Sequence, residues 1–167
     1  NDQAISIGYS DRYLKSPWSL MLLSGFLALF ENNSIQKIHV QTLSPNFSQP
    51  SSQISHDWLR ASDQVAILDL WLRSQFSISP TIDVGGKARD IQHGRVIAVT
   101  WKSGKQSKIY LDQGMGYWRP SMPYRNQLSF DFNKNHENQV MQILEKYKVI
   151  RMQHGGEWPT YISIVMC

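Results

Sequence analysis

The sequence predicts a single α/β domain in which a mixed β-sheet is flanked by helices. Strand-like and helix-like segments alternate through the first half of the chain, an order typical of a parallel or mixed sheet with helical crossovers. A β-hairpin pattern follows in the second half. With 167 residues, 41% of them hydrophobic, the chain can fill one core but not two. We therefore treat residues 1–167 as one domain.

The first half contains three predicted strands and two predicted helices. Ser16 offers a hydroxyl N-cap and Pro17 suits a first helical turn, so an apolar helix is expected to begin there and to end at Asn32. Pro80 lies in the last of the three strands, which favours an edge position in the sheet. The predicted strands are residues 4–9, 35–43 and 78–84, and the second helix is residues 56–76.

The second half is richer in β-branched residues and turns. Residues 95–101 are mostly β-branched and apolar. Lys102-Ser-Gly-Lys105 has the turn chemistry of a hairpin, so residues 107–111 are predicted to be the partner strand. A glycine-rich turn over residues 112–120 should follow. Further predicted elements are a strand over 128–132, an amphipathic helix over 136–148 and a closing strand over 161–166.

Composition narrows the class of protein. The chain has one cysteine, Cys167, so it can form no internal disulfide, and this favours a cytoplasmic protein. The apolar run from Trp18 to Phe30 is shorter than the ~20 residues that cross a bilayer. The chain begins at Asn1 and not at Met, so we expect a domain taken from a longer polypeptide.

Positive charge is concentrated in the middle of the chain. Residues 87–125 contain eight Lys and Arg against two Asp, whereas the whole chain has a net charge of +4. Such a bias favours binding of nucleic acid or another polyanion, and an anionic membrane surface is an alternative partner. A solvated hairpin face would explain the same charges. The predicted nucleic-acid-binding residues are Arg89, Arg95, Lys102, Lys105, Lys108, Trp118 and Arg119.

A catalytic alternative centres on His93. Phospholipase D-type enzymes use a histidine nucleophile in an H-x-K-x4-D pattern that occurs twice. Here Arg95 occupies the lysine position and Thr100 the aspartate position, and no second copy exists. If the protein is an enzyme, a phosphodiesterase or nuclease would use His93 with Asp11 or Asp112, and a homodimer would supply the second histidine. A protein-interaction scaffold is the third alternative.

No cofactor or metal site is predicted. The five histidines are scattered and show no zinc-ligand spacing. Gly114-Met-Gly116 is followed by Pro120, which discourages the helix that a phosphate-binding loop requires, so these glycines are interpreted as a tight turn.

Several short segments resemble a known family. They are Tyr9-Ser-Asp-Arg-Tyr-Leu, the apolar helix with Leu22 and Phe26, Ala88-Arg-Asp-Ile91, and Leu111-Asp-Gln-Gly-Met-Gly-Tyr-Trp-Arg-Pro120. In this order they are similar to the phospholipase D-like domain at the C-terminus of MIT-domain proteins and to related domains in bacterial defence and helicase proteins. Lys87-Ala88 stands where that family has histidine. The resemblance implies a phospholipase D-like fold without catalytic pairs, used as a polyanion-binding accessory module of a larger protein or complex.

Overall fold

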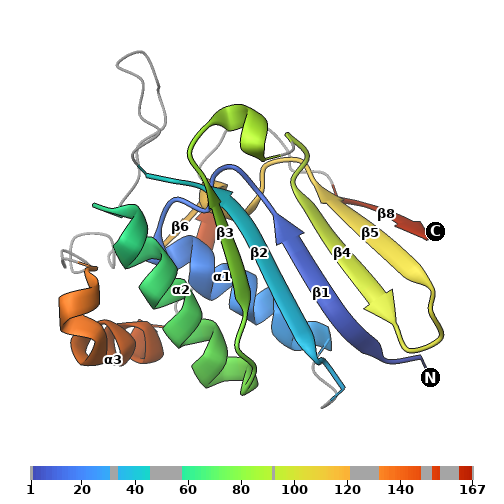
Figure 1. Ribbon diagram of the computed structural model, residues 1–167, viewed down its shortest axis with the longest axis horizontal. Helices are drawn as coiled ribbons and strands as arrows, with labels where there is room; N and C mark the ends of the chain where they lie inside the picture. Colours follow the sequence, from blue (N-terminus) through green and yellow to red (C-terminus); the bar gives the residue numbers. More distant parts are fainter. Residues whose placement is uncertain are drawn as a thin grey trace.

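A six-stranded mixed sheet forms the centre of the molecule (Figure 1). The computed structural model describes residues 2–30, 34–45, 58–91, 93–120, 132–147, 152–154 and 162–166. The strand order is β3-β2-β1-β4-β5-β8, with β1 parallel to β2 and antiparallel to β4. The strands are β1 (Ala4–Ser10), β2 (Lys37–Leu43), β3 (Thr81–Gly85), β4 (Val96–Trp101), β5 (Gln106–Leu111) and β8 (Ile162–Met166). The predicted α/β class with a mixed sheet is therefore confirmed.

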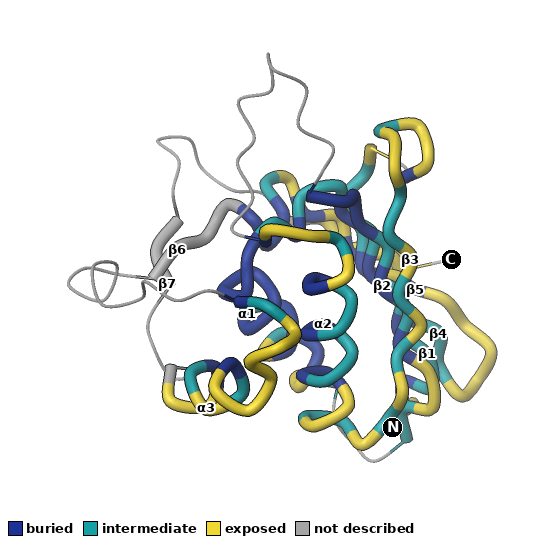
Figure 2. The backbone as a smooth tube through the Cα atoms, turned by 60° about the vertical axis from the view of Figure 1, so that its left-hand side comes forward, coloured by how far each residue is buried: buried dark blue, intermediate teal, exposed yellow. Residues whose placement is uncertain are grey.

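The described α-helices all lie on one side of this sheet, as Figure 2 shows with the strands nearly edge-on. They are α1 (Pro17–Leu27), α2 (Ala61–Phe76) and α3 (Glu137–Tyr147). Short 3₁₀ turns are η1 (Ala28–Phe30), η2 (Ala88–Asp90), η3 (Met115–Tyr117) and η5 (Lys134–His136). A separate two-stranded pair joins β6 (Trp118–Pro120) to β7 (Met152–His154).

Helix α1 begins as its sequence predicts. The Ser16 side chain accepts a hydrogen bond from the backbone N–H of Ser19, and Pro17 occupies the first turn. Most of the helix is buried in the core that it shares with the sheet and α2, which explains why it is apolar on nearly every side. On α2, the Trp71 indole N–H donates to Ser24 Oγ of α1 at 2.9 Å, so this buried polar pair fixes the two helices together.

Helix α2 is shorter than predicted. It starts at Ala61 rather than at residue 56, because Arg60 has an extended backbone. Trp58 precedes the helix and is still buried, with its indole N–H donating to the Leu14 carbonyl at 3.1 Å. Leu59, an apolar residue within the predicted helix, is 66% exposed. A tertiary hydrogen bond, and not helical periodicity, therefore places Trp58.

The hairpin of β4 and β5 matches the prediction. Lys102 to Lys105 form the turn, with Gly104 at a φ of 85°, a conformation that glycine adopts without strain. Strand β3 lies at one edge of the sheet, as Pro80 indicated, and β8 lies at the other. The predicted strand over residues 128–132 lies outside the described residues, except for Phe132, which is buried against Trp18.

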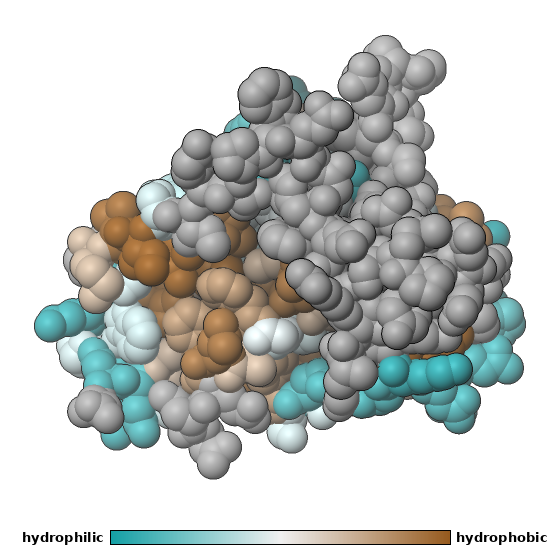
Figure 3. Space-filling view, turned by 180° about the vertical axis from the view of Figure 1, so that it is seen from behind, coloured by the Kyte–Doolittle hydropathy of each residue, from teal (hydrophilic) through white to brown (hydrophobic). Residues whose placement is uncertain are grey.

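The core fills the space between the sheet and the helices. Strand side chains that point to the helices are almost all apolar and buried, including Ile7, Val40 and Ile97. Seen from behind, this side also presents apolar surface next to the grey atoms (Figure 3). In the part of the chain that the structure describes, no helix is long and apolar enough to cross a membrane.

Candidate ligand-binding face

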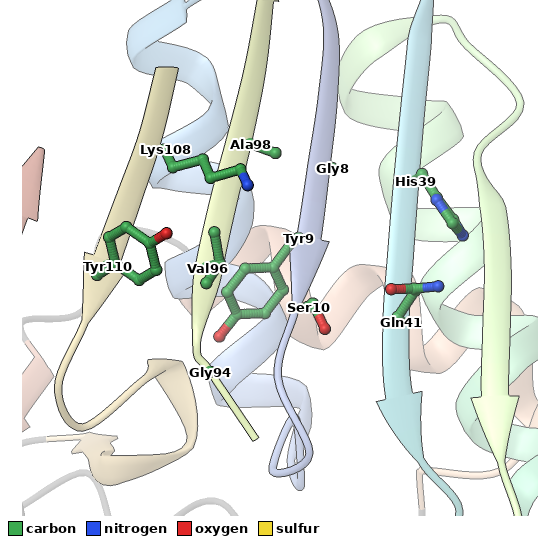
Figure 4. A pocket seen from close by; sticks show the side chains of 10 residues that line it. All are labelled: Gly8, Tyr9, Ser10, His39, Gln41, Gly94, Val96, Ala98, Lys108 and Tyr110. Atoms are coloured by element: carbon green, nitrogen blue, oxygen red, sulfur yellow. The ribbon is translucent and has the colours of Figure 1, made fainter. Parts of the chain in front are cut away.

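The face of the sheet that points away from the helices carries a groove. It encloses about 290 Å³ and crosses β2, β1, β4 and β5 (Figure 4). Its floor is made of small residues in neighbouring strands, because Gly8 of β1 pairs with Ala98 of β4. The lining residues are Gly8, Tyr9, Ser10, His39, Gln41, Gly94, Val96, Ala98, Lys108 and Tyr110. The groove is therefore a feature of the sheet's uncovered side, where no described helix lies.

Polar groups line one side of the groove. Ser10 Oγ is shielded from solvent and has no hydrogen-bond partner within the described structure. Gln41 is the neighbour of Ser10 on β2, and both Gln41 and His39 hydrogen-bond to Asp83 on β3, with His39 Nε2 2.6 Å from the carboxylate. These contacts, that of His39 first, lower the pKa of Asp83 below its usual value of 3.8. The carboxylate thus orients two side chains beside a serine that has hydrogen-bonding capacity left.

Strand β5 supplies the opposite side. Lys108 pairs with Ala98 and Tyr110 pairs with Val96, so both side chains emerge on the groove face. The Tyr110 side chain is 39% exposed. Figure 4 shows the aromatic ring and the lysine side by side along this strand. The charged end of Lys108 and the accessible ring of Tyr110 therefore lie next to the floor that Gly8 and Ala98 form.

Two further lysines continue the positive charge to the end of the hairpin. Lys102 and Lys105 are exposed in the turn, which is fixed to the first strand by a hydrogen bond from the Lys102 N–H to the Gln3 carbonyl at 2.7 Å. Asp2 is the nearby acid. Its pKa is lowered mainly by hydrogen bonding to Ser103 and, to a lesser degree, by the charge of Lys105. No carboxylate in the described ranges forms an ion pair with Lys102, Lys105 or Lys108.

The remaining predicted nucleic-acid-binding residues are distributed differently. Arg89 is exposed in η2, beyond the opposite end of the strands. The guanidinium of Arg95 faces inward: it donates to the Asp112 carbonyl and lies over the Tyr13 ring at 5.4 Å. The side chains of Trp118 and Arg119 lie outside the described part of the structure. Arg95 is therefore engaged inside the molecule, whereas the hairpin lysines and Arg89 are accessible.

Arg95 belongs to a buried polar cluster around Asp11. The Asp11 carboxylate is fully buried and accepts hydrogen bonds from the Tyr9 hydroxyl at 2.7 Å and the Tyr13 N–H at 2.8 Å. Arg95 Nε lies 3.8 Å from the same carboxylate, beyond hydrogen-bonding distance. Burial raises the pKa of Asp11 despite these contacts, and burial together with the Asp11 charge raises the pKa of Tyr9. This cluster holds the loop after β1 against the glycine-rich turn.

The glycines of that turn are required by close packing. A Cβ on Gly114 would lie 2.3 Å from Asp11 Oδ2, and one on Gly116 would lie 2.0 Å from the Tyr13 carbonyl oxygen. Gly114 also has a φ of 63°. Gly114 and Gly116 therefore form the predicted tight turn, with a structural reason that the sequence did not reveal.

The catalytic candidates Asp11 and Asp112 both lie near the Arg95 side chain. His93 and Asp112 are both exposed, but no hydrogen bond or ion pair joins them to each other or to Asp11 in the described structure. Asp11 is shielded from solvent by its own partners. No group of three or more potential metal ligands occurs among the residues that the structure describes.

Sequence reasoning missed the groove itself. The signal was present in the outward positions of the predicted strands, where Gly8, Ser10, His39 and Gln41 alternate with buried apolar residues. Strand order is needed to place these residues beside Lys108, and a single sequence does not contain it.

Comparison with known protein families gives a match over nearly the whole chain. Residues 1–166 match the family described as the C-terminal domain of the DEAD/DEAH box helicase YjiV. The chain belongs to this family. It is thus an accessory domain of a helicase-family protein, which agrees with the prediction that the chain is a module of a larger protein. A search of curated proteins found no match.

Proposed function

We propose that this domain binds nucleic acid for a helicase-family protein, through the β4–β5 hairpin and the adjoining uncovered sheet face. The observation that carries the proposal is the set of three exposed lysines, Lys102, Lys105 and Lys108, on one hairpin without a described ion-pair partner. Family membership supports it, because a helicase acts on nucleic acid. Arg89 is a further contact in this proposal, whereas Arg95 acts on loop structure.

The physical basis is the release of counterions from phosphates. Each lysine that neutralises one phosphate makes the logarithm of the binding constant fall by about 0.7–0.9 per decade of salt concentration. Three hairpin contacts would therefore give a slope of roughly −2 to −3. The lysines do not need to discriminate between sequences, because phosphate contacts carry no sequence information.

Charge reversal on the hairpin tests the proposal. Fluorescence anisotropy with labelled DNA and RNA oligonucleotides would measure affinity across a salt series. The Lys102→Glu/Lys105→Glu/Lys108→Glu variant should bind at least tenfold more weakly and lose most of the salt slope. The single variants Lys108→Glu and Lys134→Glu form a matched pair, since Lys134 is exposed in η5, next to α3 and away from the hairpin, and Lys134→Glu should leave the affinity unchanged.

Two results would contradict the proposal: salt-insensitive binding, or equal affinity of the triple variant and the wild type. Binding to anionic vesicles but not to oligonucleotides would favour the membrane alternative. Capture of a protein partner that survives high salt would favour the scaffold alternative.

The resemblance to a phospholipase D-like domain stays a prediction, as does catalysis by His93. Asp11 is buried and hydrogen-bonded to Tyr9 and Tyr13, so the exposed Asp112 is the acid that this alternative would use. If the protein hydrolysed a generic phosphodiester, and His93→Ala lost this activity while binding was unchanged, the catalytic alternative would be favoured over a binding role alone.

A further inference from the structure

We infer that the groove on the uncovered sheet face accepts one unpaired nucleobase, so that the domain prefers single-stranded to double-stranded nucleic acid. This inference rests on the proposed function and specifies its ligand. It uses the groove residues rather than the lysines of the turn, so the two proposals can fail separately.

The floor of the groove is flat because two neighbouring strands have small residues at the same level. Gly8 and Ala98 are paired across β1 and β4, and the nearest atom to a Cβ built on Gly8 would be the Ala98 Cβ at 3.9 Å. No atom would therefore come closer than ordinary van der Waals contact to a methyl group at Gly8. A planar aromatic ligand could lie there in contact with the backbone, which larger side chains at these positions would prevent.

The groove offers both contacts that a base requires. Tyr110 presents an accessible ring, and aromatic side chains stack on bases whatever their identity. On the other side, Ser10 Oγ has unused hydrogen-bonding capacity and Gln41 is held beside it by Asp83. A base edge that donates or accepts hydrogen bonds could bond to Gln41 directly, and to Ser10 Oγ once the serine side chain turns from its shielded position toward the groove.

The position of Lys108 connects this site to the backbone of the ligand. Lys108 is on the same strand as Tyr110, two residues away and on the same face, at the level of the Gly8–Ala98 floor. A phosphate adjacent to the stacked base would meet this cation. The volume of about 290 Å³ is near the lower limit of ~300 Å³ for small-ligand pockets, which suits one base and not a stacked base pair of a duplex.

The experiment compares three probes on the 167-residue chain. They are a labelled oligothymidylate of about twelve nucleotides, an abasic oligomer with the same number of phosphates, and a duplex of the same length. The wild type should bind the oligothymidylate roughly tenfold more tightly than the abasic oligomer, because one stacked base is lost in the latter.

Gly8→Val fills the floor of the groove and should abolish this preference. Ser6→Val is the matched control, since Ser6 is on the same strand and face but does not line the groove. Tyr110→Leu should also bind both oligomers equally, and Tyr110→Trp should keep the preference. Circular dichroism and thermal unfolding of each variant would establish that it is folded.

The outcomes separate the two proposals. If the wild type binds the oligothymidylate and the abasic oligomer equally, or if Gly8→Val keeps the preference, the base site is refuted while phosphate binding stands. If the Lys102→Glu/Lys105→Glu variant, which leaves Lys108 in the groove unchanged, binds like the wild type but Gly8→Val does not, the base site stands and phosphate contact through the turn lysines is refuted. If none of the probes binds, both are refuted.

Discussion

The two faces of the sheet use the same strand alternation for different purposes. On the helix-covered face, Ile7, Val40 and Ile97 are nearly inaccessible and pack against α1 and α2. On the other face, the neighbouring positions Gly8, His39 and Ala98 form an open groove. Helices therefore supply the stability, and the uncovered side is left free of packing constraints.

The contrast between the two faces indicates which residues carry function in such a domain. Residues on the covered face are explained by burial alone, since hydrophobic contacts account for their size and polarity. Residues on the uncovered face are small, polar or aromatic without a packing reason in the described structure. Contact with solvent explains the polar residues, and the ligand proposed above would give a reason for the small residues and the accessible ring beside them.

The largest expected effect would come from truncating a core side chain. Trp71→Ala should lower the free energy of unfolding by about 3–5 kcal/mol, because it removes a buried ring and its hydrogen bond to Ser24. The corresponding truncation on the uncovered face, Tyr110→Ala, should cost less than about 1 kcal/mol. Urea unfolding would measure both. Similar losses would mean that the two faces do not differ in role.

Alanine substitution at two glycines should give a stability effect of intermediate size. Gly116→Ala should cost about 1–3 kcal/mol, because the new methyl group would overlap the Tyr13 carbonyl and the loop would have to move. Gly8→Ala should change stability by less than about 0.5 kcal/mol, since its methyl group would make only an ordinary van der Waals contact with the Ala98 Cβ. Thermal unfolding of the two variants gives the comparison, and an equal loss at both positions would contradict it.

The smallest effect concerns the pH dependence of stability. Burial raises the pKa of Asp11 in the folded state above the usual value of 3.8, so the folded protein binds a proton more readily than the unfolded chain. Stability should therefore increase as pH falls through the raised pKa toward 3.8, and decrease as pH rises through the same window.

The Asp11→Asn variant provides the reference, because it cannot titrate at this position. Its free energy of unfolding, subtracted from that of the wild type at each pH, isolates the contribution of Asp11. The free energy of unfolding of the wild type should increase relative to that of the variant as the pH falls through that window. A difference that stays constant, or that changes in the opposite direction, would show that burial does not dominate the environment of Asp11.

Much of the fold was predictable because local sequence determines it. The Ser16–Pro17 cap, the Lys102–Lys105 turn and the edge position of β3 follow from backbone chemistry within a few residues. The start of α2 was predicted too early, because Trp58 is apolar like a helix residue yet is held by a hydrogen bond to Leu14.

The site was harder to predict, because it depends on contacts between residues that are far apart in the sequence. Positive charge indicated the hairpin lysines but also Arg95, whose partners Tyr13 and Asp112 come from other segments of the chain. The groove combines residues from β2, β1, β4 and β5, and only the tertiary pairing of those strands brings them together. Charge composition could not distinguish an internal arginine from an accessible lysine.

The pairing of β1 with β4 joins segments about ninety residues apart, since Gly8 lies opposite Ala98. Such non-local pairing forms late and slows folding. The floor of the groove consequently has no counterpart in the unfolded chain, and any ligand that binds it binds only the folded state. At a hundredfold excess over its Kd, such a ligand would stabilise the domain by about 2.7 kcal/mol, so a rise in Tm would report occupancy.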